Sequence, residues 1–330
     1  MSTDGPNLLT PLELRGVRLP NRIMMSPMSQ HRADVDGRAN DWHLVHYGSR
    51  AVGGVGIIMV EDCAVRSDGR LSNGALGLYA DSQVEPLRRV VEFCREAGSV
   101  VGIQLGHAAR KAFGKAKGFG PHPLVAPSPI PFESDWAVPI ELDDAGIDAL
   151  VEAFGEAAHR AVQAGFDIVE VHGAHGYLLH EFMSPLTNQR NDAYGGSWEN
   201  RVRLTLRVVE RVREVVPDRM LVFFRLSADD LEEGGLTVED SIALTSLLKE
   251  RGVDVIDVSA GGLKAAPVGS HTPNQPALAK RLREATGMPT IGVGGVTDAV
   301  KGNALLADGT CDIVAVGRAL LEDPYWPRRI

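Results

Sequence analysis

Residues 167–201 read DIVEVHGAHGYLLHEFMSPLTNQRNDAYGGSWENR, and this stretch decides the fold class of the chain. It opens with IVEV, a short β-branched apolar run of the kind that is buried in a parallel sheet. The run leads directly into His172, and His175 and Tyr177 follow with only small residues between them. Ligands of parallel α/β proteins bind at the carboxyl ends of the strands. The stretch therefore predicts a parallel sheet with a functional site at the end of this strand.

The histidine pair also raises the alternative of a metal site. His172 and His175 are spaced as His-x-x-His, whereas zinc proteases carry His-Glu-x-x-His on a helix. Glycine and alanine fill the gap, and no third ligand stands close by in the sequence. We therefore predict a site without metal and keep a metal-dependent barrel hydrolase as the alternative from another enzyme class.

The composition of the 330 residues, 44% hydrophobic and 23% charged, is that of an ordinary globular protein. A net charge of −9 argues against nucleic acids and anionic membrane surfaces as partners. No apolar run approaches the ~20 residues that span a bilayer, and the N-terminus lacks the basic and apolar regions of a secretory signal. Three scattered cysteines without a CxxC pair suit a reducing compartment. We expect a cytoplasmic protein.

A pattern of strand followed by helix recurs along the whole chain. Its eight units predict one closed (β/α)8 barrel, a TIM barrel, and residues 1–330 are expected to form a single domain because no linker or change of composition divides them. The strands are predicted at residues 23–28, 55–60, 100–105, 168–171, 221–226, 255–258, 290–293 and 313–316. The helices are predicted at residues 42–52, 84–97, 144–164, 197–215, 238–251, 276–285 and 298–307.

Three features depart from the plain repeat. Residues 11–20 predict an N-terminal β-hairpin with Gly16 near its turn. The connection after the third strand, residues 106–142, is long and rich in Gly, Pro and Lys, and we expect it to form a lid. Little sequence remains after Arg318, so either the eighth helix is short or the barrel contacts a partner there.

Glycines follow the seventh and eighth predicted strands. Gly294, Gly295 and Gly317 would let backbone N–H groups approach a phosphate closely, since a Cβ would obstruct its oxygens. Arg318 adds a fork-shaped donor for the same anion. Either loop alone is compatible with a tight turn and a surface arginine, but the pair predicts a phosphate site.

Two further polar side chains belong to the expected site. Gln104 ends the third strand, and Arg225 is a cation within the apolar fifth strand, where a buried charge needs a partner or a ligand. With the phosphate site at one edge and the imidazole pair opposite, this arrangement suits a flat heteroaromatic cofactor with a phosphate tail. FMN fits, because glutamine can pair with its pyrimidine edge and arginine can stabilise the negative charge that the ring gains on reduction.

Several segments are together highly specific for one family: PLELRGVRLPNRI, SPMS, GIQLGHAARKA, IVEVHGAHGYLLHEFMSP, NDAYGGSWENR and VGRALLEDP. The chain resembles the Old Yellow Enzyme family of FMN-dependent ene-reductases, and within it the thermophilic-like branch. The resemblance runs from about Leu9 to Pro327. It implies non-covalently bound FMN, reduction by NAD(P)H, and ping-pong transfer of hydride from flavin N5 to the β-carbon of an α,β-unsaturated carbonyl compound.

The resemblance also implies a role for each site residue. His172 and His175 are the catalytic pair that hydrogen-bonds the activating carbonyl, and Tyr177 is the catalytic proton donor to the α-carbon. His31 joins these three in the substrate-binding set. The FMN contacts are expected from Ser26, Pro27, Met28 and Ser29 along the flavin, from Asp62, Gln104 and Arg225 at the ring and ribityl chain, and from Gly294, Gly295, Gly317 and Arg318 at the phosphate.

The chain departs from the pattern of this branch in four ways. The branch usually has cysteine where Ser29 stands and tyrosine where His31 stands. Asp62 takes the place of a small residue near the ring and adds a possible negative charge there. The sequence also stops before the C-terminal tail that reaches a neighbouring subunit's site in some relatives.

We expect an FMN-dependent NAD(P)H ene-reductase that acts on a small enone or enoate. The alternatives are flavin-dependent oxidative dehydrogenation or rearrangement of a specialised metabolite on the same scaffold, and a flavin-binding protein without turnover. A homo-oligomer, a dimer or larger, is expected because the short last helix leaves an apolar gap beside it. Neither a nucleic acid nor a membrane is expected as a partner.

Overall fold

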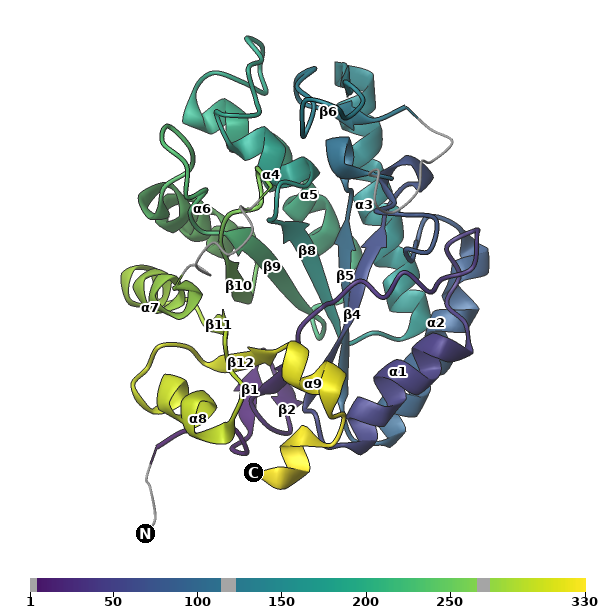
Figure 1. Ribbon diagram of the computed structural model, residues 1–330, viewed down its shortest axis with the longest axis vertical. Coiled ribbons are helices and arrows are strands. Elements are labelled where there is room, and N and C mark those ends of the chain that lie inside the picture. Colours follow the sequence, from purple (N-terminus) through teal and green to yellow (C-terminus); the bar gives the residue numbers. More distant parts are fainter. Residues whose placement is uncertain (1–4, 114–122, 266–273) are drawn as a thin grey trace.

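Eight parallel strands close into a barrel in which each strand pairs with the next barrel strand along the chain, and the last pairs with the first (Figure 1). The structure is a computed structural model that describes residues 5–113, 123–265 and 274–330. The barrel strands are β3 (Ile23–Met25), β4 (Ile57–Ala64), β5 (Val100–Gly106), β8 (Ile168–Gly173), β9 (Leu221–Ser227), β10 (Val255–Ser259), β11 (Thr290–Val293) and β12 (Ile313–Val316). The predicted (β/α)8 barrel is therefore confirmed.

Helices link the strands and surround the barrel (Figure 1). Ser197 Oγ accepts a hydrogen bond from the backbone N–H of Asn200 and caps the fourth of the long helices, as Asp143 and Asp298 cap two others. Such caps contribute roughly 1 kcal/mol each. The helices are α1 (Asp41–Val52), α2 (Val84–Glu96), α3 (Asp144–Ala164), α5 (Trp198–Val215), α6 (Val238–Glu250), α7 (Gln275–Thr286), α8 (Ala299–Ala307) and the short α9 (Arg318–Glu322).

Alternate strand residues face two different cores. Ile57, Met59 and Phe223 point into the barrel and are fully buried in an interior cluster. Ile58 and Val60 on β4 instead belong to the core between the barrel and its helices. Because both faces are buried, the strands are almost continuously apolar, and each fully buried large side chain contributes about 1.5–3 kcal/mol. Polar residues inside these strands are therefore exceptions that need a physical reason.

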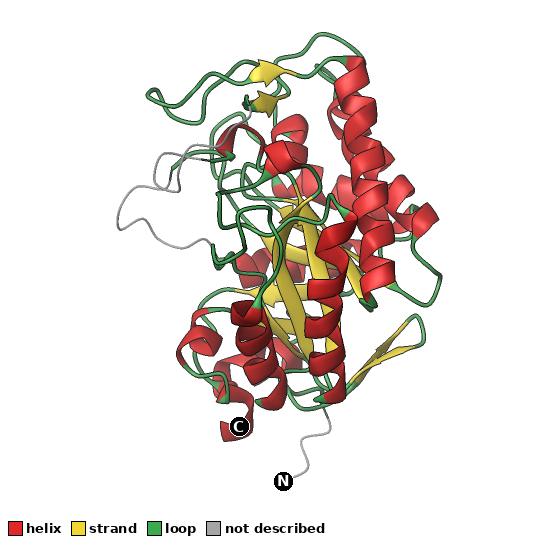
Figure 2. Ribbon diagram, turned by 90° about the vertical axis from the view of Figure 1, so that its right-hand side faces the viewer, coloured by secondary structure: helices red, strands yellow, loops and turns green. Residues whose placement is uncertain are grey.

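The predicted N-terminal hairpin is confirmed and consists of β1 (Leu12–Leu14) and β2 (Val17–Leu19). Arg15 and Gly16 form its turn, and both have positive φ. Leu19 is fully buried in the barrel's interior cluster, so the hairpin packs on the amino-terminal end of the barrel (Figure 2). The loops that could bind a ligand lie at the opposite, carboxyl end.

Two strands differ from their predicted bounds by more than two residues at one end, while the other differences are of one or two residues. The first strand, β3, ends at Met25 rather than at residue 28, because Pro27 has no N–H with which to continue the ladder. The second strand, β4, spans residues 57–64 instead of 55–60. Its extra length includes two acidic residues, Glu61 and Asp62, which are described below.

The connection after β5 contains regular structure of its own. It includes η3 (Ala109–Lys111) and a small two-stranded sheet of β6 (Val125–Ala126) and β7 (Ile140–Glu141), which lies above the barrel in Figure 2. Residues 114–122 lie outside the described residues, so the lid stays a prediction.

Two shorter helices complete the chain. The sequence did not predict α4 (Leu178–Met183), which follows β8 directly. The expected short eighth helix is confirmed as α9, after which η5 (Trp326–Arg329) ends the chain. No helix within the described residues is both long and apolar enough to cross a membrane.

Candidate active site

Three aromatic side chains meet edge to face just beyond β8. The ring centroids of His172 and Tyr177 are 5.0 Å apart, those of His172 and His175 are 5.2 Å apart, and those of His175 and Tyr177 are 6.4 Å apart. His172 lies in β8 and is buried, whereas His175 and Tyr177 lie on the following turn and are half-buried. The structure thus brings together the three residues that the sequence singled out at this strand end.

The turn that carries His175 is held in a constrained backbone conformation. His175 and Gly176 have φ values of 60° and 66°, a region that costs free energy for residues other than glycine. A Cβ at Gly176 would lie 2.3 Å from the carbonyl oxygen of Gly262, in the loop after β10, so only glycine fits. The backbone N–H of His175 donates to Ser227 Oγ at 3.0 Å. The turn after β8 therefore contacts both the end of β9 and the loop after β10, and these contacts fix the position of the His175 imidazole.

The hydrogen bonds assign the proton position on His172 and show which nitrogen of His175 is already bonded. The backbone N–H of Ala174 donates to His172 Nδ1 at 3.3 Å, which places the proton of the neutral ring on Nε2. His175 Nε2 lies 2.6 Å from Ser259 Oγ, and this hydroxyl accepts from Gln275 Nε2 at 3.2 Å. If the Ser259 hydroxyl donates to His175 Nε2, the proton of that ring lies on Nδ1. One nitrogen of each ring, Nε2 of His172 and Nδ1 of His175, has no hydrogen bond to a described residue.

Burial keeps the three rings in their neutral forms. It lowers the pKa of His172 and of His175 well below the usual range, and the Arg225 cation lowers both further. Burial also raises the pKa of Tyr177 above its usual range, and the nearby Asp62 carboxylate adds to this rise. At neutral pH the cluster offers two neutral N–H donors and a protonated phenol. Such a set can bind a carbonyl oxygen and supply a proton.

A buried network under the turn supports the cluster. The backbone N–H of Gly176 donates to His180 Nδ1 at 2.8 Å, and His180 Nε2 lies 2.6 Å from Asp230 Oδ1. Asp230 Oδ2 accepts from Ser184 Oγ and from the backbone N–H of Leu236, at 2.7 Å each. Sequence reasoning missed this network because it depends on α4, which was not predicted.

Lys111 borders the cluster on the side of η3. Its Nζ lies 5.0 Å from the centroid of the Tyr177 ring and 4.6 Å from that of Phe132. The same ammonium donates to the carbonyl oxygens of His175 and Gly262, at 2.8 and 3.1 Å. It therefore joins the connection after β5 to the two loops that hold the imidazole pair.

A layer of buried polar groups lies inside the barrel, between its apolar interior and its mouth. Gln104 Nε2 donates to Glu170 Oε1 at 2.8 Å, and Arg225 Nε lies 3.2 Å from Asp257 Oδ2. All four residues are at least 94% buried. The predicted pair Gln104 and Arg225 thus lies in this layer, and Asp257 is the partner that the buried guanidinium requires.

The two acids of this layer were missed from the sequence. Glu170 and Asp257 are carboxylates in otherwise apolar strands, the same signal that identified Arg225. Burial raises the pKa of Glu170 to about 8; the charge of Asp257 adds to the rise, and Arg225 opposes it. Burial raises the pKa of Asp257 as well. Two carboxyl groups therefore compete for one cation.

A β-bulge places a third acid at the barrel mouth. The pairing of β4 with β5 shifts between Val60 and Cys63, so Glu61 and Asp62 together lie opposite Gln104. The bulge explains why this strand continues beyond its predicted end. It also brings Asp62, a predicted ring contact, to the same end of the barrel as the three-ring cluster.

The segment after β3 runs beside the loop after β12. The backbone N–H of Ser26 donates to the carbonyl oxygen of Val316 at 3.1 Å. Met28 Sδ lies 3.4 Å from the place where a Cβ of Gly317 would stand. Ser26 is buried, and residues 27–29 are half-buried. The segment expected along the flavin therefore adjoins one of the expected phosphate loops.

His31 lies at the outer end of this segment. It is exposed, has a φ of 55°, and its Nδ1 lies 2.7 Å from Ser72 Oγ. This bond connects the segment to the loop after β4. A role of His31 in substrate binding stays a prediction.

The two glycine loops have the geometry that an anion site needs. Gly294 and Gly295 have φ values of 117° and 62°, in the region that favours glycine. A Cβ at Gly294 would lie 2.8 Å from Gln275 Oε1. Gly317 precedes α9, and Arg318 is exposed without an ion pair or hydrogen bond to any described residue. Backbone N–H groups and one guanidinium are therefore available to an anion.

These residues fit FMN. The glycine loops and Arg318 suit its phosphate, and Gln104, held by Glu170, suits the pyrimidine edge of its ring. Arg225, whose Nε forms a 3.2 Å ion pair with Asp257, is a buried cation that suits the negative charge a flavin ring gains on reduction. Within the same residues, no group of three or more His, Cys, Asp or Glu side chains could hold a metal ion.

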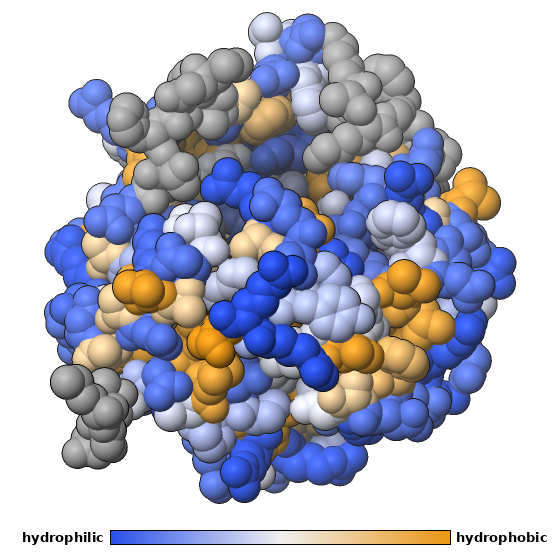
Figure 3. All heavy atoms as spheres, turned by 60° about the horizontal axis from the view of Figure 1, so that its bottom comes forward, coloured by the Kyte–Doolittle hydropathy of each residue, from blue (hydrophilic) through white to orange (hydrophobic). Residues whose placement is uncertain are grey.

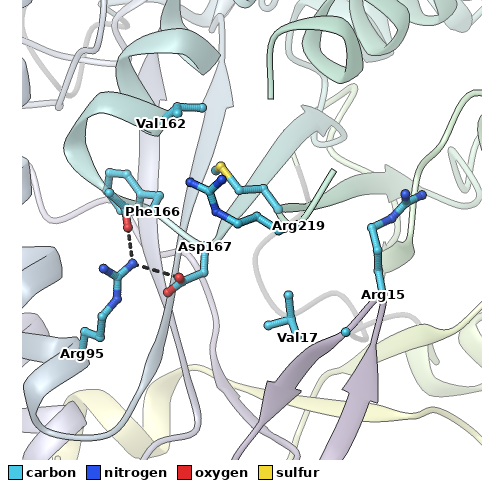
Figure 4. Close-up of a pocket in the computed structure, with 10 residues that line it drawn as sticks. Arg15, Val17, Arg95, Val162, Phe166, Asp167 and Arg219 are labelled. Atoms are coloured by element: carbon cyan, nitrogen blue, oxygen red, sulfur yellow. Dashed lines mark hydrogen bonds and ion pairs between the residues drawn. The ribbon is translucent and has the colours of Figure 1, made fainter. Parts of the chain in front are cut away.

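A separate cavity of about 410 Å³ lies at the other end of the barrel, beside the hairpin (Figure 4). Arg15, Arg95 and Arg219 line it. Arg15 forms an ion pair of 2.7 Å with Asp254, and Arg95 one of 2.8 Å with Asp167. Its described lining contains no histidine, cysteine or tyrosine. The carboxyl end therefore stays the candidate active site.

Comparisons of this chain with a family model, with known sequences and with solved structures agree with one another. The model of the NADH:flavin oxidoreductase / NADH oxidase family matches residues 7–330. The NADPH dehydrogenase of Geobacillus sp. (strain WCH70) is 42% identical over 321 residues, which are 97% of this chain and 92% of that protein. The structure of morphinone reductase superposes with a TM-score of 0.85 and 31% identity, over 100% of this chain and 90% of that one. An old yellow enzyme homologue from Zymomonas mobilis gives a TM-score of 0.84 and 27% identity, over 98% and 92%.

Proposed function

Because this chain belongs to the NADH:flavin oxidoreductase / NADH oxidase family, and is thus an FMN-dependent NADPH oxidoreductase, we propose that it reduces the C=C bond of α,β-unsaturated carbonyl compounds. The observation that carries the proposal is the three-ring cluster, in which two neutral imidazoles and a protonated phenol converge at one strand end. When bound, FMN would supply the hydride that it has received from NAD(P)H.

The chain's own residues would bind and polarise the substrate. His172 Nε2 and His175 Nδ1 have no hydrogen bond to a described residue, and with a proton on each they would donate to one carbonyl oxygen. Two such donors stabilise the negative charge that the oxygen acquires as the β-carbon is reduced. Because both rings are neutral, neither protonates the oxygen outright. Tyr177, held against His172, then delivers its hydroxyl proton to the α-carbon.

We test this function with an anaerobic two-step titration of the FMN-loaded protein. NADPH should bleach the flavin absorbance, and adding an enone should restore it. A panel of cyclic and open-chain enones would define the substrate class. Bleaching without recovery by any enone or enoate would contradict the proposal. It would leave two alternatives, oxidative dehydrogenation or rearrangement of a specialised metabolite and flavin binding without turnover.

Arg318→Ala is expected to weaken FMN binding while the barrel stays folded. Arg318 is exposed at the start of α9 and has no partner among the described residues. Truncating its side chain should therefore remove only its hydrogen bond to the ligand and no interaction that stabilises the fold. A charge-assisted hydrogen bond contributes about 1.5–3 kcal/mol, which is roughly a tenfold to hundredfold rise in Kd. Fluorescence titration of the apoprotein with FMN measures it. Arg329→Ala, which removes an arginine paired with Asp323 nearby, is the control; equal Kd values for both variants would contradict the phosphate role.

We also propose a homo-oligomer formed through the face of α1 and α9. Trp42, Val45 and Leu321 are large apolar side chains that are 46%, 68% and 42% exposed, and all three line one shallow groove. Figure 3 shows hydrophobic patches among polar side chains on the side of the molecule that carries the chain ends. Exposed apolar patches of this kind mark association sites.

The oligomer proposal predicts that Val45→Lys combined with Leu321→Lys shifts the wild-type oligomer toward a monomer, because two charges would be buried in the interface. Light scattering at micromolar concentration measures the mass. Val300→Lys changes an apolar residue on α8 that is 81% exposed and serves as the control. A monomeric wild type would contradict the proposal.

A further inference from the structure

Asp62 is a buried acid at the barrel mouth. It is 7% exposed, and its buried Oδ1 has no hydrogen-bond partner among the described residues. Burying a carboxyl group without partners costs free energy, and more so when it is ionised. A small apolar residue at this position would avoid that cost. The stability of the fold therefore does not explain why an acid stands at this position.

The bulge in β4 turns its two acids in opposite directions. Glu61 faces outward, where its Oε1 accepts from the hydroxyl of Tyr47 on α1 at 3.1 Å. Asp62 faces inward: its Oδ1 lies 2.1 Å from the place where a Cβ of Gly106 would stand, and His172 Cβ lies 3.2 Å from the same point. The carboxyl group is therefore wedged against β5 beside the first imidazole, in space that exists only because residue 106 is glycine.

Several ionisable groups share this environment. The Asp62 charge raises the pKa values of Glu61 and Glu170, and it contributes to that of Tyr177. Burial alone raises the pKa of Asp62 itself to about 7. The groups around it are Glu61 and Cys63 on β4, Glu170 and His172 on β8, Tyr177 at the start of α4, and Arg225 on β9, which is the register partner of His172.

We propose that Asp62 makes the reduction potential of the bound flavin depend on pH, by placing a titratable negative charge beside the ring. The inference rests on FMN binding at this mouth, as in the proposed function. The ring gains negative charge when it takes up hydride from NAD(P)H, and an ionised Asp62 opposes that gain. Once the ring is reduced, Asp62 binds a proton more readily, so reduction near neutral pH is accompanied by uptake of one extra proton from water onto its carboxylate.

The sign of the effect follows from the protonation of Asp62. At pH values below its pKa the carboxyl group is neutral, and Asp62→Asn should leave the potential unchanged. Above its pKa the wild type carries the opposing charge, and Asp62→Asn should make the flavin easier to reduce. We expect the equilibrium constant for reduction to rise roughly tenfold, which is ~30 mV for a two-electron couple.

The experiment is a reductive titration of the FMN-loaded protein against a dye of known potential, from about pH 5.5 to about pH 8.5, a range that brackets the titration of Asp62. The reduction potential of Asp62→Asn should match that of the wild type at the acidic end and diverge from it at the alkaline end. Asp62→Ala should behave in the same way, and it serves as a second variant in case the asparagine amide disturbs packing. Glu61→Gln, which removes the outward-facing acid of the same bulge, is the matched control and should diverge from the wild type less than Asp62→Asn does.

The outcomes of these experiments distinguish failure of the Asp62 proposal from failure of ene reduction and from failure of FMN binding. Curves for Asp62→Asn and Asp62→Ala that run parallel to the wild type at all pH values would overturn it, as would an equal change in Glu61→Gln. Because no enone takes part, failure of ene reduction would leave this result standing. Absence of flavin absorbance in the wild type would instead overturn both this inference and the FMN assignment.

Discussion

Tyr177→Phe should slow the oxidation of the reduced enzyme by an enone by roughly 10²–10⁴-fold, the contribution of a positioned general acid. The phenol lies edge to face with His172, 5.0 Å between centroids, and burial keeps it protonated at neutral pH. Phenylalanine preserves the ring packing and removes only the acidic proton. Reduction of the flavin by NADPH should be nearly unchanged, because delivery of hydride to the ring needs no acid from this residue.

Stopped-flow absorbance measures the two half-reactions separately. Tyr325→Phe, which changes a tyrosine that is 44% exposed near the C-terminus, is the control for loss of a phenol elsewhere. Equal oxidative rates in the wild type and in Tyr177→Phe would remove Tyr177 from the mechanism. Equal slowing of both half-reactions would point to a displaced flavin rather than to a lost proton donor.

Arg225→Met should destabilise the apoprotein by about 3–5 kcal/mol, the typical cost of breaking a buried ion pair from one side. The change removes the cation that lies 3.2 Å from Asp257 and leaves two buried carboxyl groups without compensation. The pKa values of Glu170 and Asp257 are already raised in the fold, and without Arg225 they should rise further. A group whose pKa is raised on folding stabilises at low pH and loses that contribution as pH rises. The penalty should therefore grow from about pH 4 to about pH 8.

Urea unfolding of the apoprotein at several pH values measures this penalty. Adding Asp257→Asn to Arg225→Met removes one of the two orphaned acids and should recover part of the lost stability. A loss below about 1 kcal/mol, or one that does not change with pH, would show that Arg225 does not hold this layer together. Asp254→Asn, which alters an acid paired with Arg15 outside the barrel, is a control for loss of a carboxylate from the same strand region.

The barrel depends on patterns within single segments of the sequence, and these local patterns therefore predicted most of it. Apolar runs that are buried on both faces located the strands, and the cap at Ser197 located the start of α5. The strand ends then located His172, Gln104 and Arg225, since parallel strands in a barrel all end at the same mouth.

The features that were missed depend on pairing between distant segments. The bulge at Glu61 and Asp62 exists only in relation to β5, so no pattern within β4 reveals it. The link from Gln275 through Ser259 to His175 joins the start of α7, the end of β10 and the turn after β8. Glu170 and Asp257 could have been found from the sequence, because a single carboxylate in a buried strand needs a partner or a ligand just as a single arginine does.

The most direct test of the proposed reaction follows two hydrogens into the product. An enone is reduced with NADPH that carries deuterium at both C4 positions, and in a second experiment with ordinary NADPH in deuterium oxide. Mass spectrometry and NMR locate the label. The account predicts label from NADPH at the β-carbon and label from solvent at the α-carbon, with the carbonyl group intact. Label from NADPH on the carbonyl carbon, with an alcohol as product, would contradict it.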